Sequence, residues 1–223
     1  MKIFLESRII RLSRKPHKHW SVSDLSFEYS SLSQVRDAFI AFEKADKTER
    51  LTFWSADNFK TLKADFFSLV RYIKAAGGVV KNEKNEVLVI FRYGQWDLPK
   101  GKVKTGPGKN EENKSGEEPE KIPQAALREV MEETGLSKVT ITGKLSPTFH
   151  IYREKGKQIL KKTSWFEMKA TSDQPLIPQS EEDISIVKWA GREEIREITE
   201  STYPSLKKLF RETFKNYPQR RKE

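Results

Sequence analysis

Residues 122–136, IPQAALREVMEETGL, constrain the fold of this chain more than any other stretch. Pro123 suits the first turn of a helix, and Gly135 suits the position just after the last turn. Ala126 and Val130 are one turn apart and give the predicted helix an apolar side. The sequence therefore predicts a helix that ends at Gly135 and packs against a sheet.

The same helix carries three carboxylates on one face. Glu129, Glu132 and Glu133 stand at positions i, i+3 and i+4, which places them side by side. Such carboxylates repel one another, and hard oxygen ligands of this kind are what Mg²⁺ or Mn²⁺ prefers. The face therefore predicts a divalent-metal site. Taken alone, however, an acidic helix face is more often simply exposed to solvent.

Strand patterns surround this helix, and further helices close the chain. Residues 79–93 form two strand candidates around the polar turn KNEKNE. The later strand candidates are residues 138–145, 148–154, 160–170 and 181–190, and the closing helices are residues 192–199 and 205–216. This order predicts an α+β fold with a mixed sheet.

Residues 1–75 form a separate pattern of their own. Residues 1–13 and RLTFWS are strand-like, and two amphipathic helices follow them, which gives a β-α-β-α unit. Gly77 and Gly78 end the second helix, so we place the boundary between a small N-terminal module (1–75) and a larger domain (76–223) here. The module carries no chemical motif. We interpret it as a packing or dimerisation unit, with substrate recognition as the alternative. A homodimer of the chain is compatible with this interpretation.

Composition excludes several classes of protein. The chain has no cysteine and three histidines, which argues against a disulfide scaffold, a cysteine nucleophile and a histidine metal site. No apolar run approaches the roughly 18 residues that span a bilayer. The net charge is +10, with basic ends, but no RNA-binding motif accompanies it. We expect a cytoplasmic protein with no membrane partner and no nucleic-acid partner.

The acidic helix resembles the Nudix box, G-x5-E-x7-R-E-U-x-E-E-x-G-U, in which U is a bulky aliphatic residue. Residues 128–136, REVMEETGL, match the second half of the box at every fixed position. Glu120 stands eight residues before Arg128, which is the spacing of the box. The preceding WDLPKGKV is similar to the usual flank of the family. The resemblance implies a Nudix-type α/β/α sandwich and a pyrophosphohydrolase.

The resemblance also implies roles for individual residues. Glu129, Glu132 and Glu133 would bind Mg²⁺ or Mn²⁺, and Glu129 would alternatively orient or deprotonate the water. Arg128 and Glu120 would form an ion pair that holds the acidic face in place. Family members often supply a further carboxylate after the box, and the candidates are Glu181 and Glu182.

One departure from the box lies before Glu120. Lys114 stands where the box has glycine, and the glycine of the PKG loop is Gly101. Residues 105–119 lack any large apolar side chain, so we interpret them as a low-complexity insertion. Because WDLPKGK is intact before this insertion, we expect Gly101 to keep the metal-facing backbone position.

A nucleotide-type substrate needs cations for its phosphates and aromatic rings for its base. The candidate substrate contacts are Arg92, Lys100, Lys102, Lys162, Tyr152 and Trp165. WDLPKGKV, HIYRE and KKTSWFEM look most like the branch that hydrolyses diadenosine polyphosphates and diphosphoinositol polyphosphates. A dinucleoside polyphosphate is therefore the first expectation. ADP-ribose or a nucleoside diphosphate sugar is the alternative substrate, and a non-catalytic module that binds a nucleotide or RNA is the alternative class.

Overall fold

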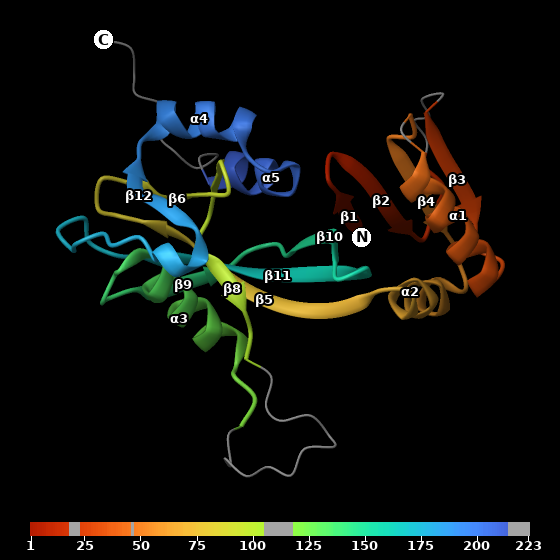
Figure 1. Cartoon of the computed structure of the whole chain (residues 1–223), viewed down its shortest axis with the longest axis horizontal. Helices are drawn as coiled ribbons and strands as arrows, with labels where there is room; N and C mark the ends of the chain where they lie inside the picture. The colour runs from red at the N-terminus through yellow and green to blue at the C-terminus, as the bar shows by residue number, and fades with distance from the viewer. Residues whose placement is uncertain (18–22, 46, 105–117, 214–223) are drawn as a thin grey trace. The chain divides into compact units, whose positions relative to one another are not determined.

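The computed structural model describes residues 1–17, 23–45, 47–104 and 118–213, and it divides the chain into two units (Figure 1). One unit consists of Met1–Ile73 and Thr148–Lys162, and the other of Lys74–Pro147 and Thr163–Glu223. The first boundary lies close to the predicted one at residue 75. The sequence suggested that residues 148–162 belong to the larger domain. In the structure they are part of the N-terminal unit.

The N-terminal unit combines two helices with part of the sheet. Its elements are β1 (Lys2–Leu5), β2 (Arg8–Ser13), β3 (Asp24–Glu28), α1 (Leu32–Lys44), β4 (Arg50–Trp54), α2 (Phe59–Ser68) and β10 (Thr148–Glu154). The strand order is β10-β1-β2-β4-β3. β1 runs parallel to β10 and antiparallel to β2, and both β2 and β3 run parallel to β4.

Three details of the structure differ from the β-α-β-α prediction. The second helix, α2, ends at Ser68 instead of at Gly77 and Gly78, and residues 71–77 form the first part of strand β5 (Arg71–Lys81). The strand-like segment 1–13 is a hairpin, because Glu6 turns the chain with a φ of 54° between β1 and β2. β3 is an additional strand that pairs with β4. Helix α1 follows the prediction: the Ser31 hydroxyl accepts a hydrogen bond from the Gln34 N–H, and Phe39 and Phe42 are buried against the sheet.

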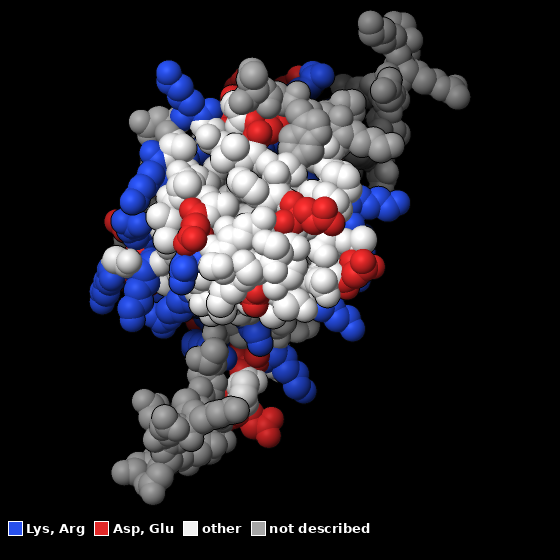
Figure 2. All heavy atoms as spheres, turned by 90° about the vertical axis from the view of Figure 1, so that its right-hand side faces the viewer, with Lys and Arg blue, Asp and Glu red and all other residues white. Residues whose placement is uncertain are grey.

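The outer surface of the N-terminal unit includes some apolar side chains. Leu32 and Ile40 on α1 are each 42% exposed, and Leu25 on β3 is 38% exposed. Figure 2 looks onto the side of the structure where Figure 1 draws α1 and β3. The middle of this face is mostly uncharged, and Lys and Arg side chains gather along one edge.

The larger unit is built on the strand order β12-β6-β5-β11. Its elements are β5 (Arg71–Lys81), β6 (Val87–Arg92), β7 (Gln95–Asp97), β8 (Lys100–Lys102), α3 (Ile122–Thr134), β9 (Thr140–Lys144), β11 (Lys157–Lys169), the short 3-10 helix η1 (Ser180–Glu182), β12 (Ile184–Ala190), α4 (Arg192–Ser201) and α5 (Pro204–Thr213). The short strands β7, β8 and β9 pair with β6, β5 and β11, respectively. Strands β5 and β11 begin in the N-terminal unit and continue into this one.

Helices cover both faces of this sheet (Figure 1). On one face, Ala126 and Val130 of α3 pack in a cluster with Val80 and Met168 of the sheet. On the other face, α4 and α5 pack against Val79, Val89 and Trp165. Alternate residues of a strand point to opposite faces, so each strand contributes to both clusters. The predicted α+β fold, with helices on two sides of a mixed sheet, is confirmed. None of the described helices is long and apolar enough to cross a membrane.

The insertion leaves and re-enters this unit at a closed stem. Residues 105–117 lie outside the described part of the chain. At the stem, the Glu120 N–H donates to the Lys104 carbonyl at 3.1 Å, and the Lys104 N–H donates to Glu120 Oε2 at 2.9 Å. In a four-residue β-turn, the N–H of the last residue donates to the carbonyl of the first. The bond from Glu120 to Lys104 has this pattern, so two residues between them could close the chain in a turn.

We therefore predict that residues 105–119 are dispensable for folding. Replacing them with Asn-Gly should keep the Lys104–Glu120 stem and leave the melting temperature (Tm) equal or higher, because a shorter loop loses less entropy on folding. Thermal unfolding checks this, and a variant with the 105–119 residues scrambled is the control. A marked loss of Tm in the shortened protein alone would show that this segment supports the fold.

Candidate active site

Local sequence signals fix the position of α3 and therefore of its acidic face. Gly135 ends the helix with a φ of 77°, and its N–H donates to the Met131 carbonyl at 2.9 Å. Ala126 and Val130 are fully buried against the sheet. With the apolar side held in the core, the register of the helix directs Arg128, Glu129 and Glu132 away from it.

Arg128 is the centre of the polar network on α3. Its Nε and Nη2 donate to the two carboxylate oxygens of Glu120 at 2.7 and 2.9 Å. Its Nη1 lies 2.8 Å from both Glu129 Oε1 and Glu132 Oε2, and its Nη2 also donates to the Lys102 carbonyl at 3.1 Å. The hydrogen bonds from Arg128 hold the pKa of Glu120 below its ordinary value. One guanidinium thus ties the helix to both the PKG loop and the stem of the insertion.

Glu129 lies directly against the backbone of Gly101. A Cβ atom added to Gly101 would lie 1.9 Å from Glu129 Oε2, so any other residue at this position would force the carboxylate to move. Burial raises the pKa of Glu129 above its ordinary value, although the adjacent Arg128 lowers it. The intact PKG loop and the first carboxylate of the helix are therefore in close contact, and the metal-facing position of Gly101 stays a prediction.

We predict that Gly101→Ala damages activity more than stability. The new methyl group would displace the Glu129 carboxylate, and an error of about 1 Å in a catalytic group costs about 100-fold in rate. Gly143→Ala in β9 is the matched control, because a Cβ there would meet its nearest neighbour at an ordinary 3.7 Å. The measurements are kcat/KM and Tm for both variants. Equal activity of the two variants would show that the contact between Gly101 and the Glu129 carboxylate is not needed for catalysis.

Glu133 is the buried carboxylate of the site. Its side chain is 1% exposed, and it accepts hydrogen bonds from Arg92 Nη1 at 3.1 Å and from the Lys100 N–H at 2.7 Å. Burial raises the pKa of Glu133 to about 7, against the lowering effect of Lys100 and Arg92. Glu133 is therefore held between β6, β8 and α3, with Oε2 directed to the PKG loop and Oε1 to Arg92.

Arg92 also brings one of the two downstream acids to the site. Its Nη2 donates to Glu182 Oε2 at 2.6 Å, so Glu182 and Glu133 share one guanidinium. Glu181 is exposed, and its side chain accepts a hydrogen bond from the neighbouring Ser180 hydroxyl. Of the two predicted further acids, Glu182 is the one that joins the network around α3.

Two residues that the sequence analysis missed border the same network. Asp97 is 3% exposed and forms an ion pair with the Lys100 ammonium group. Burial raises the pKa of Tyr203, and the charge of Asp97 adds to that effect. The acid in WDLPKGK is a local signal that could have indicated Asp97. Tyr203 reaches this network from the α4–α5 connection, which no local pattern indicates.

The donor set suits a divalent cation, but the carboxylates are not assembled as one cluster. Among the described residues, no group of three or more His, Asp or Glu side chains converges closely enough to hold a metal ion. Glu129 and Glu132 share Arg128, whereas Glu133 faces Arg92 and Lys100. The predicted binding of one metal ion by these three carboxylates therefore stays a prediction. Their oxygens, and the backbone of Gly101 beside them, still fit a hard cation such as Mg²⁺ in chemical type.

The predicted substrate contacts have different locations. Arg92 and Lys100 lie in the carboxylate network, and Lys102 places an exposed side chain beside it. Trp165 is 0% exposed in the core under α4 and α5, so it cannot stack on a substrate. Tyr152 and Lys162 belong to the N-terminal unit, and their contact with substrate stays a prediction.

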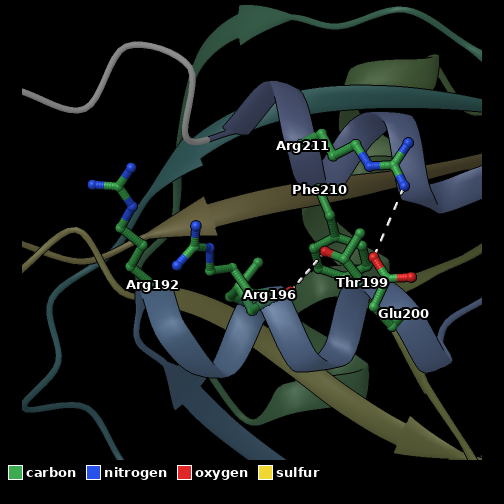
Figure 3. Close-up of a pocket in the computed structure, with 7 residues that line it drawn as sticks. Arg192, Arg196, Thr199, Glu200, Phe210 and Arg211 are labelled. Carbon is green, nitrogen blue, oxygen red and sulfur yellow. Dashed lines mark hydrogen bonds and ion pairs between the residues drawn. The ribbon is translucent and has the colours of Figure 1, made fainter. Parts of the chain in front are cut away.

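A cavity of about 440 Å³ lies elsewhere, between α4 and α5 (Figure 3). Its lining includes Arg192, Arg196 and Arg211 around Phe210, and none of the α3 carboxylates. Arg211 Nη2 lies 4.0 Å from Glu200 Oε1. Because α4 and α5 cover the face of the sheet opposite α3, this cavity is separate from the carboxylate network.

Comparison with known proteins decides the family. The NUDIX domain model matches residues 71–212, which is more than half of the chain. The chain belongs to the Nudix family. It is accordingly a Nudix-type pyrophosphohydrolase, and members of this family generally use divalent metal ions. The matched range contains the acidic helix, the PKG loop and Glu182.

Solved structures of Nudix proteins are similar to this one at low identity. The MutT protein of Methanosarcina mazei Go1 is 20% identical, with 67% of this chain and 98% of that chain covered and a TM-score of 0.47. The C. elegans Ap4A hydrolase in a binary complex is 24% identical, with coverages of 64% and 94% and a TM-score of 0.44. A bifunctional NMN adenylyltransferase/ADP ribose pyrophosphatase from Francisella tularensis, complexed with AMP and a Mn ion, is 15% identical, with coverages of 82% and 46% and a TM-score of 0.42.

Proposed function

We propose that this Nudix hydrolase cleaves a pyrophosphate bond in a nucleoside diphosphate-linked substrate, and that a dinucleoside polyphosphate is the substrate. The observation that carries the proposal is the contact of Glu129 with Gly101, next to the Glu133 carboxylate that the Lys100 N–H holds. These contacts join the acidic helix to the loop whose lysines can bind phosphate. The arrangement suits hydrolysis of a phosphoanhydride, in which positioning and charge neutralisation do most of the work.

We assign the metal-binding role to Glu129, Glu132, Glu133 and the Gly101 backbone. A divalent cation bound there would neutralise phosphate oxygens and lower the pKa of a bound water. Glu129, whose pKa burial raises, is the proposed acceptor of the proton from the attacking water. The bidentate bond between Arg128 and Glu120 makes these two residues positioning groups that keep the acidic face against the PKG loop.

Three cations support a substrate with several phosphates. Arg92, Lys100 and Lys102 lie in or beside the carboxylate network, on β6 and β8. A chain of phosphates carries more negative charge than the two phosphates of a nucleoside diphosphate sugar, so it gains more from three cations. Next to Arg92, Tyr93 is 65% exposed and offers a ring for a base. The three cations and the exposed ring support the dinucleoside polyphosphate over the sugar nucleotide.

A substrate panel tests the proposal. Purified protein with Mg²⁺ is incubated with dinucleoside polyphosphates of different phosphate number, ADP-ribose and nucleoside diphosphate sugars, and the products are separated by ion exchange. We expect the highest kcat/KM for a dinucleoside polyphosphate, and no products with EDTA. Preference for ADP-ribose would replace the substrate assignment while keeping the hydrolase. Nucleotide binding without any hydrolysis, in Mg²⁺ and in Mn²⁺, would contradict the catalytic assignment of the carboxylates.

A further inference from the structure

The sheet of the N-terminal unit has one face away from its helices. Ile3, Leu5, Ile10, Leu12 and Ile151 point to the α1–α2 side, where they join the hydrophobic core of the unit. Because side chains alternate along a strand, the residues between them lie on the opposite face. The residues on that opposite face are Lys2 and Phe4 of β1, Ile9 and Arg11 of β2, and His150 and Tyr152 of β10.

Aromatic rings from two strands lie next to one another on this face. Phe4 and His150 are directly opposite in the parallel β1–β10 pair, so their side chains are neighbours. The rings of His150 and Tyr152 are stacked, with centroids 5.3 Å apart and planes at 30°. Phe4 and Tyr152 are partly exposed, and neither belongs to a hydrophobic core cluster of the described residues. The rings therefore form a partly exposed row and are not an extension of the core.

Cations flank this row at both ends. The Lys2 ammonium lies 4.6 Å from the centroid of the Phe4 ring, and the Lys161 ammonium lies 5.1 Å from that of Tyr152. Arg11 is the cross-strand partner of Lys2. Glu154 is an acidic neighbour of Tyr152. Burial raises the pKa of Tyr152, and the negative charge of Glu154 raises it further. The face thus combines aromatic rings with an excess of positive charge.

We infer that this face of the N-terminal unit binds single-stranded nucleic acid. Unpaired bases stack on exposed aromatic rings whatever their sequence, and neighbouring Lys and Arg side chains attract the phosphates. An open sheet with rings on adjacent strands is suited to splayed bases, whereas a duplex hides its bases from such a surface. The inference goes beyond the proposed hydrolysis, replaces the sequence-based expectation of no nucleic-acid partner, and gives Tyr152 a role outside the carboxylate network.

Fluorescence anisotropy of the full chain tests the inference without involving catalysis. The probes are fluorescein-labelled U12 RNA, dT12 DNA and a 12-base-pair RNA duplex, in EDTA and low salt. We expect the single strands to bind, the duplex to bind at least about 10-fold more weakly, and the affinity to fall as salt rises. Absence of binding to both single strands, or preference for the duplex, would overturn the inference.

Matched variants separate stacking from general charge attraction. Phe4→Leu and Tyr152→Leu keep an apolar side chain but remove the ring, and each should weaken U12 binding about 10-fold. Lys161→Gln should weaken binding and reduce its salt dependence, whereas Lys60→Gln, at an exposed position on α2, should change neither. Thermal unfolding verifies that each variant is folded. If both Leu variants bind U12 as the wild type does, the aromatic row is not the binding surface.

Discussion

Glu133→Gln is expected to reduce kcat by at least about 100-fold while leaving the protein folded. Glutamine has the same shape as glutamate, but its neutral amide is a poor ligand for Mg²⁺. The carboxylate is 1% exposed, and burial raises its pKa to about 7, so its buried position favours the neutral form. A neutral group at this position should therefore keep or raise Tm. The measurements are kcat on the best panel substrate, Tm and Mn²⁺ affinity.

Glu197→Gln on α4 is the matched control for that experiment. Glu197 is exposed and lies on the helix that covers the opposite face of the sheet from α3. The same chemical change there should leave kcat, Tm and metal affinity at wild-type values. If Glu133→Gln turns over substrate at a rate close to that of this control at saturating Mg²⁺, Glu133 is not part of the metal site.

Arg128→Ala is expected to lose both activity and stability. It removes a guanidinium that pairs with Glu120, Glu129 and Glu132, and the side chains of Arg128 and Glu120 are only 21% and 14% exposed. Leaving Glu120 partly buried without its partner should cost about 2 kcal/mol of the free energy of unfolding. The displaced acidic face should lower kcat/KM about 10-fold or more. Denaturant unfolding and steady-state kinetics measure the two effects.

Two further arginine variants identify the cause. Arg128→Lys keeps the charge but cannot reproduce the two parallel bonds to Glu120, so we expect a loss between wild type and Arg128→Ala. Arg196→Ala on α4 removes an arginine that is 72% exposed and pairs with Glu193, and it should change stability by less than about 0.5 kcal/mol. Equal stabilities of Arg128→Ala and Arg196→Ala would show that the Arg128 network does not hold the site together.

The features that the sequence predicted correctly all have local causes. The α3 helix spans Ile122–Thr134 because Pro123 and Gly135 mark its ends, and its apolar stripe sets its register. The turn in KNEKNE forms because the Asn82 side chain accepts hydrogen bonds from the backbone N–H groups of Lys84 and Glu86. The spacing of Glu120 and Arg128 likewise predicted the ion pair that the structure contains.

The features that the sequence did not predict depend on contacts between distant segments. Alternation along β11 could not show that Trp165 faces the core under α4 and α5, because both faces of that strand are covered. Helical spacing places Glu129 and Glu133 on one side of α3, but it does not reveal that the two carboxylates pair with different arginines. The row of Phe4 and His150 arises from a pairing between the first strand and one far along the chain, for which no short motif exists.

The pairing of β1 with β10 also determines when the N-terminal unit can be completed during synthesis. Phe4 and Leu5 find their backbone partners in His150 and Ile151, which the ribosome adds after more than half of the chain has emerged. Until then, β1 presents an unpaired edge to its surroundings, and such an edge can pair with another nascent chain. If residues 1–75 were expressed alone, this edge of β1 would stay unpaired, so we do not expect them to form an independent domain.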